Sequence, residues 1–242
     1  MSGRRAAFLV ALILTSVPAT FAATKIVLVG DSTVADEGGW GPGFRASFGP
    51  EVEVINLARN GRSSKNFRDE RLWGPALEAR PDYILIQFGH NDGPGKGPER
   101  ETAPKTTFRE NMIRYVEEAR AIGAKPILVT SIVRRNFTAD GKIKQDSLTP
   151  YVEEVRAIAA EKQLPLIDLN VMTRAQAEAA GPTGALSIGK KKPDGKQDTT
   201  HLGPKGQRDI GRMAASELAR LVAAMQPFLL VETPASAHAV VF

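Results

Sequence analysis

Short, almost uninterrupted hydrophobic segments alternate along the chain with longer segments of mixed hydrophobic and polar residues. The short segments are rich in Val and Ile. Three of them show almost no polar alternation, which is typical of strands buried on both faces of a parallel sheet. The pattern predicts five β-strands, at residues 25–30, 51–56, 82–88, 125–131 and 164–169.

Three of the longer segments repeat their hydrophobic residues at intervals of three and four, as an α-helix with one buried face does. They predict helices over residues 108–122, 152–159 and 210–225, with Thr149 as the N-cap of the second helix and Pro150 as its first residue. Strands that alternate with helices favour right-handed crossovers. We therefore expect an α/β fold, a three-layer α/β/α sandwich around a five-stranded parallel sheet.

The first 22 residues have the pattern of a signal peptide that is removed on export. Arg4 and Arg5 precede a hydrophobic run over residues 6–17, which Pro18 ends, and small residues follow where a signal peptidase cleaves. The run is too short to cross a ~30 Å hydrocarbon core stably, although an uncleaved membrane anchor is the alternative. We expect a secreted or periplasmic protein with no stable membrane insertion, made of one domain over residues 23–226 and a C-terminal tail over residues 227–242.

Composition narrows the chemistry further. The chain has no Cys and only three His, which excludes zinc fingers, iron–sulfur clusters and thiol chemistry. Its formal net charge of +5 is mildly basic, and the sequence lacks the clustered Lys and Arg of a nucleic-acid-binding surface, so we expect no nucleic-acid partner. We also expect a monomer. The one lysine cluster, at residues 190–192, is interpreted as a solvated loop.

Polar residues follow the predicted strands at the carboxyl edge, where open parallel sheets form their ligand crevice. A further polar pair precedes the last helix. In chain order these residues are Asp31-Ser32-Thr33, Asn60-Gly61-Arg62, His90-Asn91-Asp92 and the pair Asp198 and His201.

These residue types together predict acyl transfer. A serine hydroxyl needs an imidazole to take its proton, and the imidazole needs a carboxylate to orient it, which predicts Ser32 as nucleophile, His201 as base and Asp198 as orienting residue. One short loop is expected to present both Asp198 and His201. The oxyanion hole is predicted from the backbone N–H of Ser32, the N–H of Gly61, where a missing Cβ allows close approach, and the side-chain amide of Asn91.

Each of these residues also has a purely structural interpretation. Ser32 is a possible helix cap, Gly61 and Asn91 are common turn residues, and His201 is a possible packed histidine. Their joint occurrence at strand ends favours the chemical interpretation. His90 is expected either to contact substrate or to brace the loop after the third strand.

This set of residues resembles the SGNH (GDSL) hydrolases, a superfamily named after the Ser, Gly, Asn and His of its four sequence blocks. The matches extend over residues 25–225 and are Gly30-Asp31-Ser32, Gly61, Gly89-His90-Asn91-Asp92 and Asp198-x-x-His201. Four segments look most like the rhamnogalacturonan acetylesterase branch: residues 30–35, 40–41, 60–63 and 88–92. The resemblance implies a flavodoxin-like sheet, an SGNH hydrolase domain over residues 23–226 and removal of acetyl groups from pectic polysaccharide. It also implies no metal and no organic cofactor.

The broader α/β-hydrolase fold is disfavoured because no Gly-x-Ser-x-Gly elbow surrounds Ser32. The glycine-rich residues 38–43 lack the Lys-Ser/Thr of a phosphate-binding loop and are interpreted as a flexible rim, in which Trp40 packs or stacks on a sugar. Basic residues at 62, 65, 68 and 190–192 are expected to attract galacturonate carboxylates.

Three functions stay open at this point. The first is a secreted serine esterase that removes O-acetyl groups from rhamnogalacturonan or related pectin, with an acetylated polysaccharide or oligosaccharide as its partner. The second is a lipase, lysophospholipase or thioesterase of the same superfamily, acting on longer acyl esters. The third is a carbohydrate-binding protein without catalytic activity.

Overall fold

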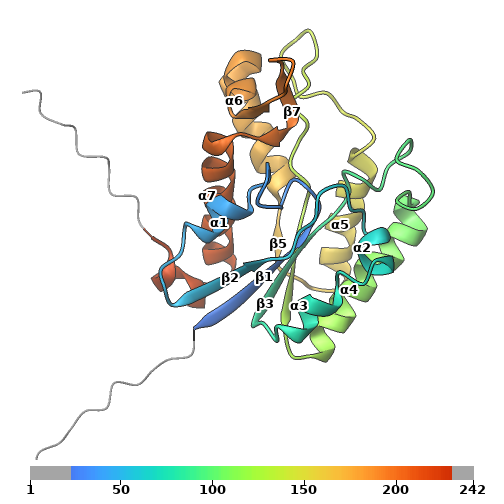
Figure 1. Cartoon of the computed structure of the whole chain (residues 1–242), viewed down its shortest axis with the longest axis vertical. Helices are drawn as coiled ribbons and strands as arrows, with labels where there is room; N and C mark the ends of the chain where they lie inside the picture. Colours follow the sequence, from blue (N-terminus) through green and yellow to red (C-terminus); the bar gives the residue numbers. More distant parts are fainter. Residues whose placement is uncertain (1–22, 231–242) are drawn as a thin grey trace, which may run out of the picture.

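A computed structural model describes residues 23–230 and contains the predicted five-stranded parallel sheet (Figure 1). The strand order is β2-β1-β3-β4-β5, which is the flavodoxin-like order. The predicted fold class is therefore confirmed. The strands are β1 (Thr24–Gly30), β2 (Val52–Asn56), β3 (Tyr83–Gln87), β4 (Lys125–Val129) and β5 (Leu166–Ile167).

Helices cover both faces of this sheet, because its central strands are hydrophobic on both sides. In β1, Ile26 and Leu28 pack into one core cluster while Val27 and Val29 pack into the other, and all four are fully buried. In Figure 1, α1 (Gly41–Arg45) and α7 (Pro204–Leu221) lie on one face of the sheet, whereas α2 (Asn66–Asp69), α3 (Gly74–Glu78), α4 (Arg109–Ala121) and α5 (Thr149–Glu161) lie on the other.

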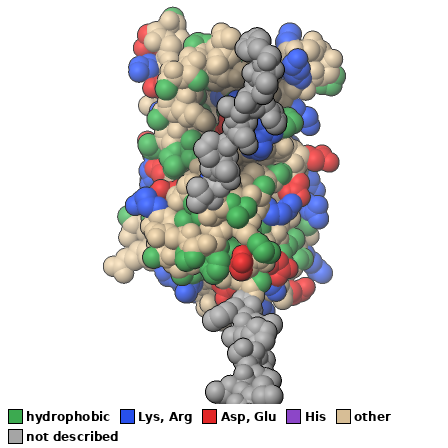
Figure 2. Space-filling view, turned by 90° about the vertical axis from the view of Figure 1, so that its left-hand side faces the viewer, with side chains coloured by type: hydrophobic (Ala, Val, Ile, Leu, Met, Phe, Trp, Pro, Cys, Tyr) green, Lys and Arg blue, Asp and Glu red, His purple; other side chains and the backbone are tan. Residues whose placement is uncertain are grey.

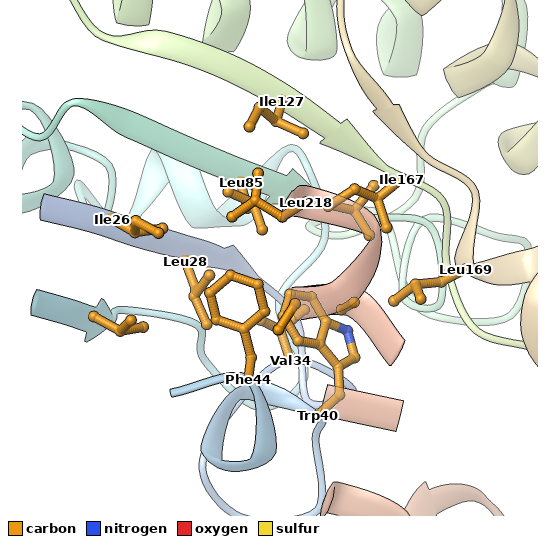
Figure 3. Packing of buried hydrophobic residues seen from close by; sticks show 14 of the residues in the cluster. Ile26, Leu28, Val34, Trp40, Phe44, Leu85, Ile127, Ile167, Leu169 and Leu218 are labelled. Atoms are coloured by element: carbon orange, nitrogen blue, oxygen red, sulfur yellow. The ribbon is translucent and has the colours of Figure 1, made fainter. Parts of the chain in front are cut away.

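The core beneath α1 and α7 is packed around Trp40 and Phe44, whose ring centroids are 5.6 Å apart in an edge-to-face contact (Figure 3). The two helices approach closely at glycines: a Cβ on Gly43 would lie 2.0 Å from the Gln207 carbonyl oxygen, and one on Gly211 would lie 2.3 Å from the Phe44 nitrogen. Gly43 is thus packed against α7, and residues 38–41 are buried as well. The interpretation of this segment as a flexible rim is wrong, and Trp40 packs in the core.

The predicted helices all form, with different ends. Helix α5 begins at Thr149, and its N-cap is Leu148 rather than Thr149, whose side chain makes no capping hydrogen bond. Helix α7 ends at Leu221. Met225 lies beyond it, in the 3-10 helix Ala223–Phe228.

The short helices α1, α2 and α3 were not predicted, and neither were the elements between β5 and α7. Helix α6 (Leu169–Ser187) follows β5, begins at the N-cap Asp168 and is interrupted at Gly181, where φ is +67°. After it, β6 (Gly189–Lys191) and β7 (Gln197–Leu202) form an antiparallel hairpin, which replaces the expected loop. A π-helical turn, Pro104–Phe108, precedes α4.

The expected signal peptide (residues 1–22) lies outside the described residues, as do residues 231–242 of the expected tail. The first residues of that tail are packed: the Leu230 N–H donates to the Ser47 carbonyl at 2.9 Å, and Leu229 forms a β-bridge with Phe48. Within residues 23–230, no helix is both long and apolar enough to cross a membrane. On the face shown in Figure 2, acidic and basic side chains are interspersed.

Candidate active site

Ser32 lies in a tight turn immediately after β1. The carboxylate of Asp31 accepts hydrogen bonds from the Thr33 N–H at 2.8 Å and the Thr33 hydroxyl at 2.7 Å, which fixes the backbone on both sides of Ser32. A glycine is required just before this turn, since a Cβ on Gly30 would lie 2.6 Å from the Gln87 carbonyl oxygen. The turn directs Ser32 to the carboxyl edge of the sheet, where its side chain lines a cavity.

A buried amide holds this turn against the neighbouring strand. The Gln87 side chain, at the end of β3, donates to the Thr33 hydroxyl oxygen at 2.6 Å and accepts from the Trp40 indole N–H at 2.9 Å. All three side chains are fully buried. A buried polar group that loses its partner costs ~1–3 kcal/mol, so this network strongly favours one position for the segment from Asp31 to Trp40.

The hairpin strand β7 brings the remaining polar pair to Ser32. The Nε2 atom of His201 lies 2.9 Å from the Ser32 Oγ, and its Nδ1 lies 2.9 Å from an oxygen of Asp198. The other Asp198 oxygen accepts from the Thr200 N–H at 2.7 Å and the His201 N–H at 2.9 Å. Ser32, His201 and Asp198 thus form one hydrogen-bonded chain. The expected loop is instead a strand, in which a bend around the Asp198 carboxylate brings the two side chains together.

Asp198 is held in its ionised form. Partial burial raises its pKa, but hydrogen bonds from the His201 ring and from the N–H groups of Thr200 and His201 outweigh this and bring the pKa down to about 2. A carboxylate that stays ionised at all physiological pH values can keep accepting the Nδ1 proton, which leaves Nε2 free to accept the proton of the Ser32 hydroxyl.

The three predicted oxyanion donors lie around the same cavity. Within residues 23–230, neither the Ser32 N–H nor the Gly61 N–H has a hydrogen-bond acceptor. The Asn91 side-chain amide donates one hydrogen bond to the Arg62 carbonyl at 3.1 Å and keeps its second N–H available. At position 61 a Cβ would meet no atom of the described protein within 4 Å, and the φ of +75° favours glycine there. Close approach of a ligand to this N–H stays a prediction.

The cavity has a volume of about 410 Å³ and is lined mainly by residues with polar or charged side chains. Among the described residues that line the cavity, only Pro193 has an apolar side chain. The other lining residues are Ser32, Glu37, Asn60, Gly61, Asn91, residues 190–192, Asp198 and His201. The lysine cluster is solvent-exposed, as expected, but it also forms part of the wall of this cavity, and Lys190 and Lys191 belong to strand β6 rather than to a loop. Among the described residues, no group of three or more His, Cys, Asp or Glu side chains could hold a metal ion.

His90 lies apart from this lining. It is 5% exposed, and both of its ring nitrogens are buried without a hydrogen-bond partner among the described residues. Burial, with repulsion from Arg134 and His201, keeps the pKa of His90 well below its usual range, so the ring is neutral. A contact between His90 and substrate stays a prediction, and the burial of the ring is better suited to supporting the loop after β3.

A protein-family comparison decides the family. The model of the GDSL-like lipase/acylhydrolase family matches residues 28–208, which contain every residue of the site described above. The chain belongs to this family, the SGNH carboxylic ester hydrolases. One relative, rhamnogalacturonan acetylesterase RhgT of Bacillus subtilis, is 35% identical over 214 residues, which cover 81% of this chain and 90% of the relative.

Solved structures of other proteins share the fold. The crystal structure of the Bacillus subtilis protein YxiM is 28% identical and superposes with a TM-score of 0.70 over 82% of this chain, which spans 56% of the length of that protein. An acetylxylan esterase from Geobacillus stearothermophilus, at 16% identity, has a TM-score of 0.62 over 88% of this chain and 98% of the other. The second similarity concerns the fold alone.

Arg135 is a residue of this SGNH site that sequence patterns did not indicate. Its guanidinium is buried and donates to the carbonyls of Asp198 and His201, each at 2.8 Å, and to that of Thr200 at 3.3 Å. Its backbone N–H donates to the Thr199 carbonyl at 2.7 Å. Burial lowers the pKa of Arg135 to about 10, a value at which the group is still charged at neutral pH. The Arg135 side chain thus binds three backbone carbonyls of β7 and holds the segment that carries Asp198 and His201.

We expect replacement of Arg135 to impair turnover more than substrate binding. Arg135→Lys keeps the charge but loses the planar fork, so His201 shifts relative to Ser32, and kcat should fall ~10–100-fold with KM little changed. The measurement is steady-state kinetics well below the Tm of each variant. Arg208→Lys, at an exposed position on α7, is the matched control. Unchanged kcat in Arg135→Lys would show that Arg135 does not position the histidine.

Asp92 predicts a pH dependence of stability. It is fully buried, and burial raises its pKa to about 7 although Ser64 and Thr102 donate hydrogen bonds to it. Between pH ~4 and pH 7 the folded protein therefore holds a proton that the unfolded chain has released, so stability should decrease as pH rises through this window. Thermal unfolding at several pH values should show that the stability of the native protein relative to Asp92→Asn falls through this window. The comparison is needed because the buried, neutral His90 contributes a slope of opposite sign in both proteins. The same change at the exposed Asp69 should leave the slope intact, and an equal slope in Asp92→Asn would contradict the assignment.

Proposed function

We propose that this SGNH hydrolase is a secreted serine esterase that removes O-acetyl groups from rhamnogalacturonan or a related pectic polysaccharide. The observation that carries the proposal is the hydrogen-bonded chain from Asp198 through His201 to Ser32. It lies at a cavity shared with the N–H groups of Ser32 and Gly61, which have no acceptor among the described residues. Nucleophile, base and oxyanion donors are the minimal set for ester hydrolysis through an acyl-enzyme.

In the first half-reaction, the Ser32 Oγ attacks the carbonyl carbon of the acetyl group while His201 Nε2 takes the hydroxyl proton. Negative charge develops on the carbonyl oxygen, where the N–H groups of Ser32 and Gly61 and the free amide N–H of Asn91 donate to it. His201 then gives its proton to the sugar oxygen, the ester bond breaks, and the deacetylated sugar leaves an acetyl group on Ser32.

In the second half-reaction, water takes the place of the sugar. His201 accepts a proton from the water as its oxygen attacks the acetyl carbon, and the same donors stabilise the second oxyanion. Collapse of this intermediate breaks the bond to Ser32, the proton on His201 returns to the Ser32 Oγ, and acetic acid leaves, which ionises to acetate in solution. Asp198 remains ionised throughout and stabilises the imidazolium that forms in each half, consistent with its pKa of about 2.

The side chains that line the cavity favour a small acyl group on a hydrophilic alcohol, because all but one of them are polar or charged. Long acyl chains gain binding energy from apolar grooves, about 0.8 kcal/mol per buried CH₂, and the lining described here offers Pro193 as its apolar side chain. The name of the relative RhgT supports rhamnogalacturonan as the alcohol component. The sequence pattern of residues 1–22 supports export.

Replacing the nucleophile tests the proposal directly. Ser32→Ala should lower acetate release from acetylated rhamnogalacturonan by ~10⁶-fold, because no other group in the cavity can form the acyl-enzyme. Ser216→Ala, at an exposed position on α7, is the control and should match the native protein. Enzymatic quantification of acetate is the measurement. Substantial acetate release by Ser32→Ala would remove Ser32 from the mechanism.

A series of acyl chain lengths separates the proposed function from the lipase and thioesterase alternative. With nitrophenyl esters, kcat/KM should be highest for acetyl and should fall more than about tenfold by octanoyl, since Pro193 is the one apolar side chain that the described lining offers to a longer chain. A maximum at butyryl or longer would instead favour the long-chain esterase.

A further inference from the structure

The basic residues expected to attract an acidic substrate fall into two groups in the structure. Those that follow β2 form ion pairs with neighbouring carboxylates, so a ligand carboxylate would have to break these ion pairs in order to bind them. The pairs are Arg62 with Glu70 at 2.7 Å, Lys65 with Asp69 at 3.0 Å and Arg68 with Glu118 at 2.8 Å.

The lysines of the β6–β7 hairpin form the second group. Lys190, Lys191 and Lys192 are exposed and line the cavity that contains Ser32 and His201. Within residues 23–230, none of the three forms an ion pair, whereas Lys196 on the same hairpin pairs with Asp194 at 3.7 Å. Three adjacent unpaired ammonium groups beside a reaction centre repel one another, and a bound anion would relieve that repulsion.

A second cavity continues from the first. It has a volume of about 470 Å³ and shares Glu37 and Asn60 with the lining of the Ser32 cavity, so the two adjoin. Arg59 contributes to its wall, is exposed and has no ion-pair partner in the described part of the chain. The reaction centre therefore has unpaired cations on both sides: the lysines in its own cavity and Arg59 in the adjoining one.

We propose that these two cavities form one groove that binds a uronate-containing oligosaccharide, with Lys190–Lys192 contacting a carboxylate on one side of the acetylated sugar and Arg59 contacting a carboxylate on the other. The inference deepens the proposed function and rests on it for the carbohydrate nature of the substrate. It assigns the recognition of acidic sugars to residues outside the groups that carry out the reaction.

The acidic residues at the groove agree with this arrangement. Asp36 lines the second cavity, but its carboxylate is engaged by Arg45 at 3.3 Å and by the Asn56 amide at 2.8 Å. Glu37, at the junction of the cavities, is exposed without an ion-pair partner among the described residues. A carboxylate there disfavours an anionic group at the junction and accepts hydrogen bonds from sugar hydroxyls, so the uronate carboxylates lie to either side of it.

Inhibition of nitrophenyl acetate hydrolysis tests the groove without using a polysaccharide ester. Trigalacturonate should inhibit competitively at low ionic strength, and its inhibition constant should rise at least about tenfold when Lys190, Lys191 and Lys192 are all changed to Gln. Arg59→Gln should raise the constant several-fold. Added salt should weaken the inhibition of the native enzyme, because exposed charges are screened over ~8–10 Å at 0.1–0.15 M.

Matched controls remove the same charge elsewhere. Lys142, Lys144, Lys205 and Arg208 are exposed and lie outside both cavity linings. A variant with the three lysines changed to Gln, and the variant Arg208→Gln, should each keep the inhibition constant within about twofold of the native value. The inference is overturned if a neutral trisaccharide such as galactotriose inhibits as well as trigalacturonate, or if the Lys190–Lys192 variant keeps the native constant. Either result leaves the proposed esterase standing, since that is tested separately by acetate release in Ser32→Ala.

Discussion

The site depends on one buried side chain, the amide of Gln87. It joins the end of β3 to the turn after β1, because it donates to the Thr33 hydroxyl and accepts from the Trp40 indole. Thr33 in turn donates to Asp31, so the hydrogen bonds continue to the residue that precedes the proposed nucleophile. None of these polar groups can exchange its partner for water without local unfolding, since all are buried. The position of Ser32 is therefore set by the interior of the protein, while its hydroxyl faces the cavity.

The sheet and its two helical layers could be predicted because their signal is local. Strands buried on both faces are continuously hydrophobic, and helices α4, α5 and α7 keep one regular apolar face. Helix α6 lacks such a signal: it is rich in alanine, and Gly181-Pro182, which normally ends a helix, lies inside it. The β6–β7 hairpin has no alternating hydrophobic residues, since lysines, Gly195 and polar side chains make up most of it. Its two strands pair with each other and β7 contacts α6 and α7, and such contacts leave no periodic pattern in the sequence.

At the site, the residue types and their order were enough to identify Ser32, His201 and Asp198 as candidates, and the structure brings their side chains into contact. What could not be predicted depends on three-dimensional neighbours. Arg135 reaches backbone carbonyls that are 63 to 66 residues away along the chain, and a bond to a carbonyl leaves no mark on the partner's residue type. Equally, the pairing of Arg62, Lys65 and Arg68 with carboxylates was invisible, because an unpaired and a paired cation look the same in a sequence.

The proposed nucleophile and its base come from structurally separate parts of the protein. Ser32 follows a central strand of the main sheet, whereas His201 and Asp198 lie on a two-stranded hairpin outside that sheet, anchored by Arg135. Only a few residues of β7 separate the tip of this hairpin, residues 192–196, from His201, the proposed general base. Under the proposal of a uronate-binding groove, exchange of this surface segment together with Lys190 and Lys191 would change substrate preference while the hydrophobic interior keeps its sequence.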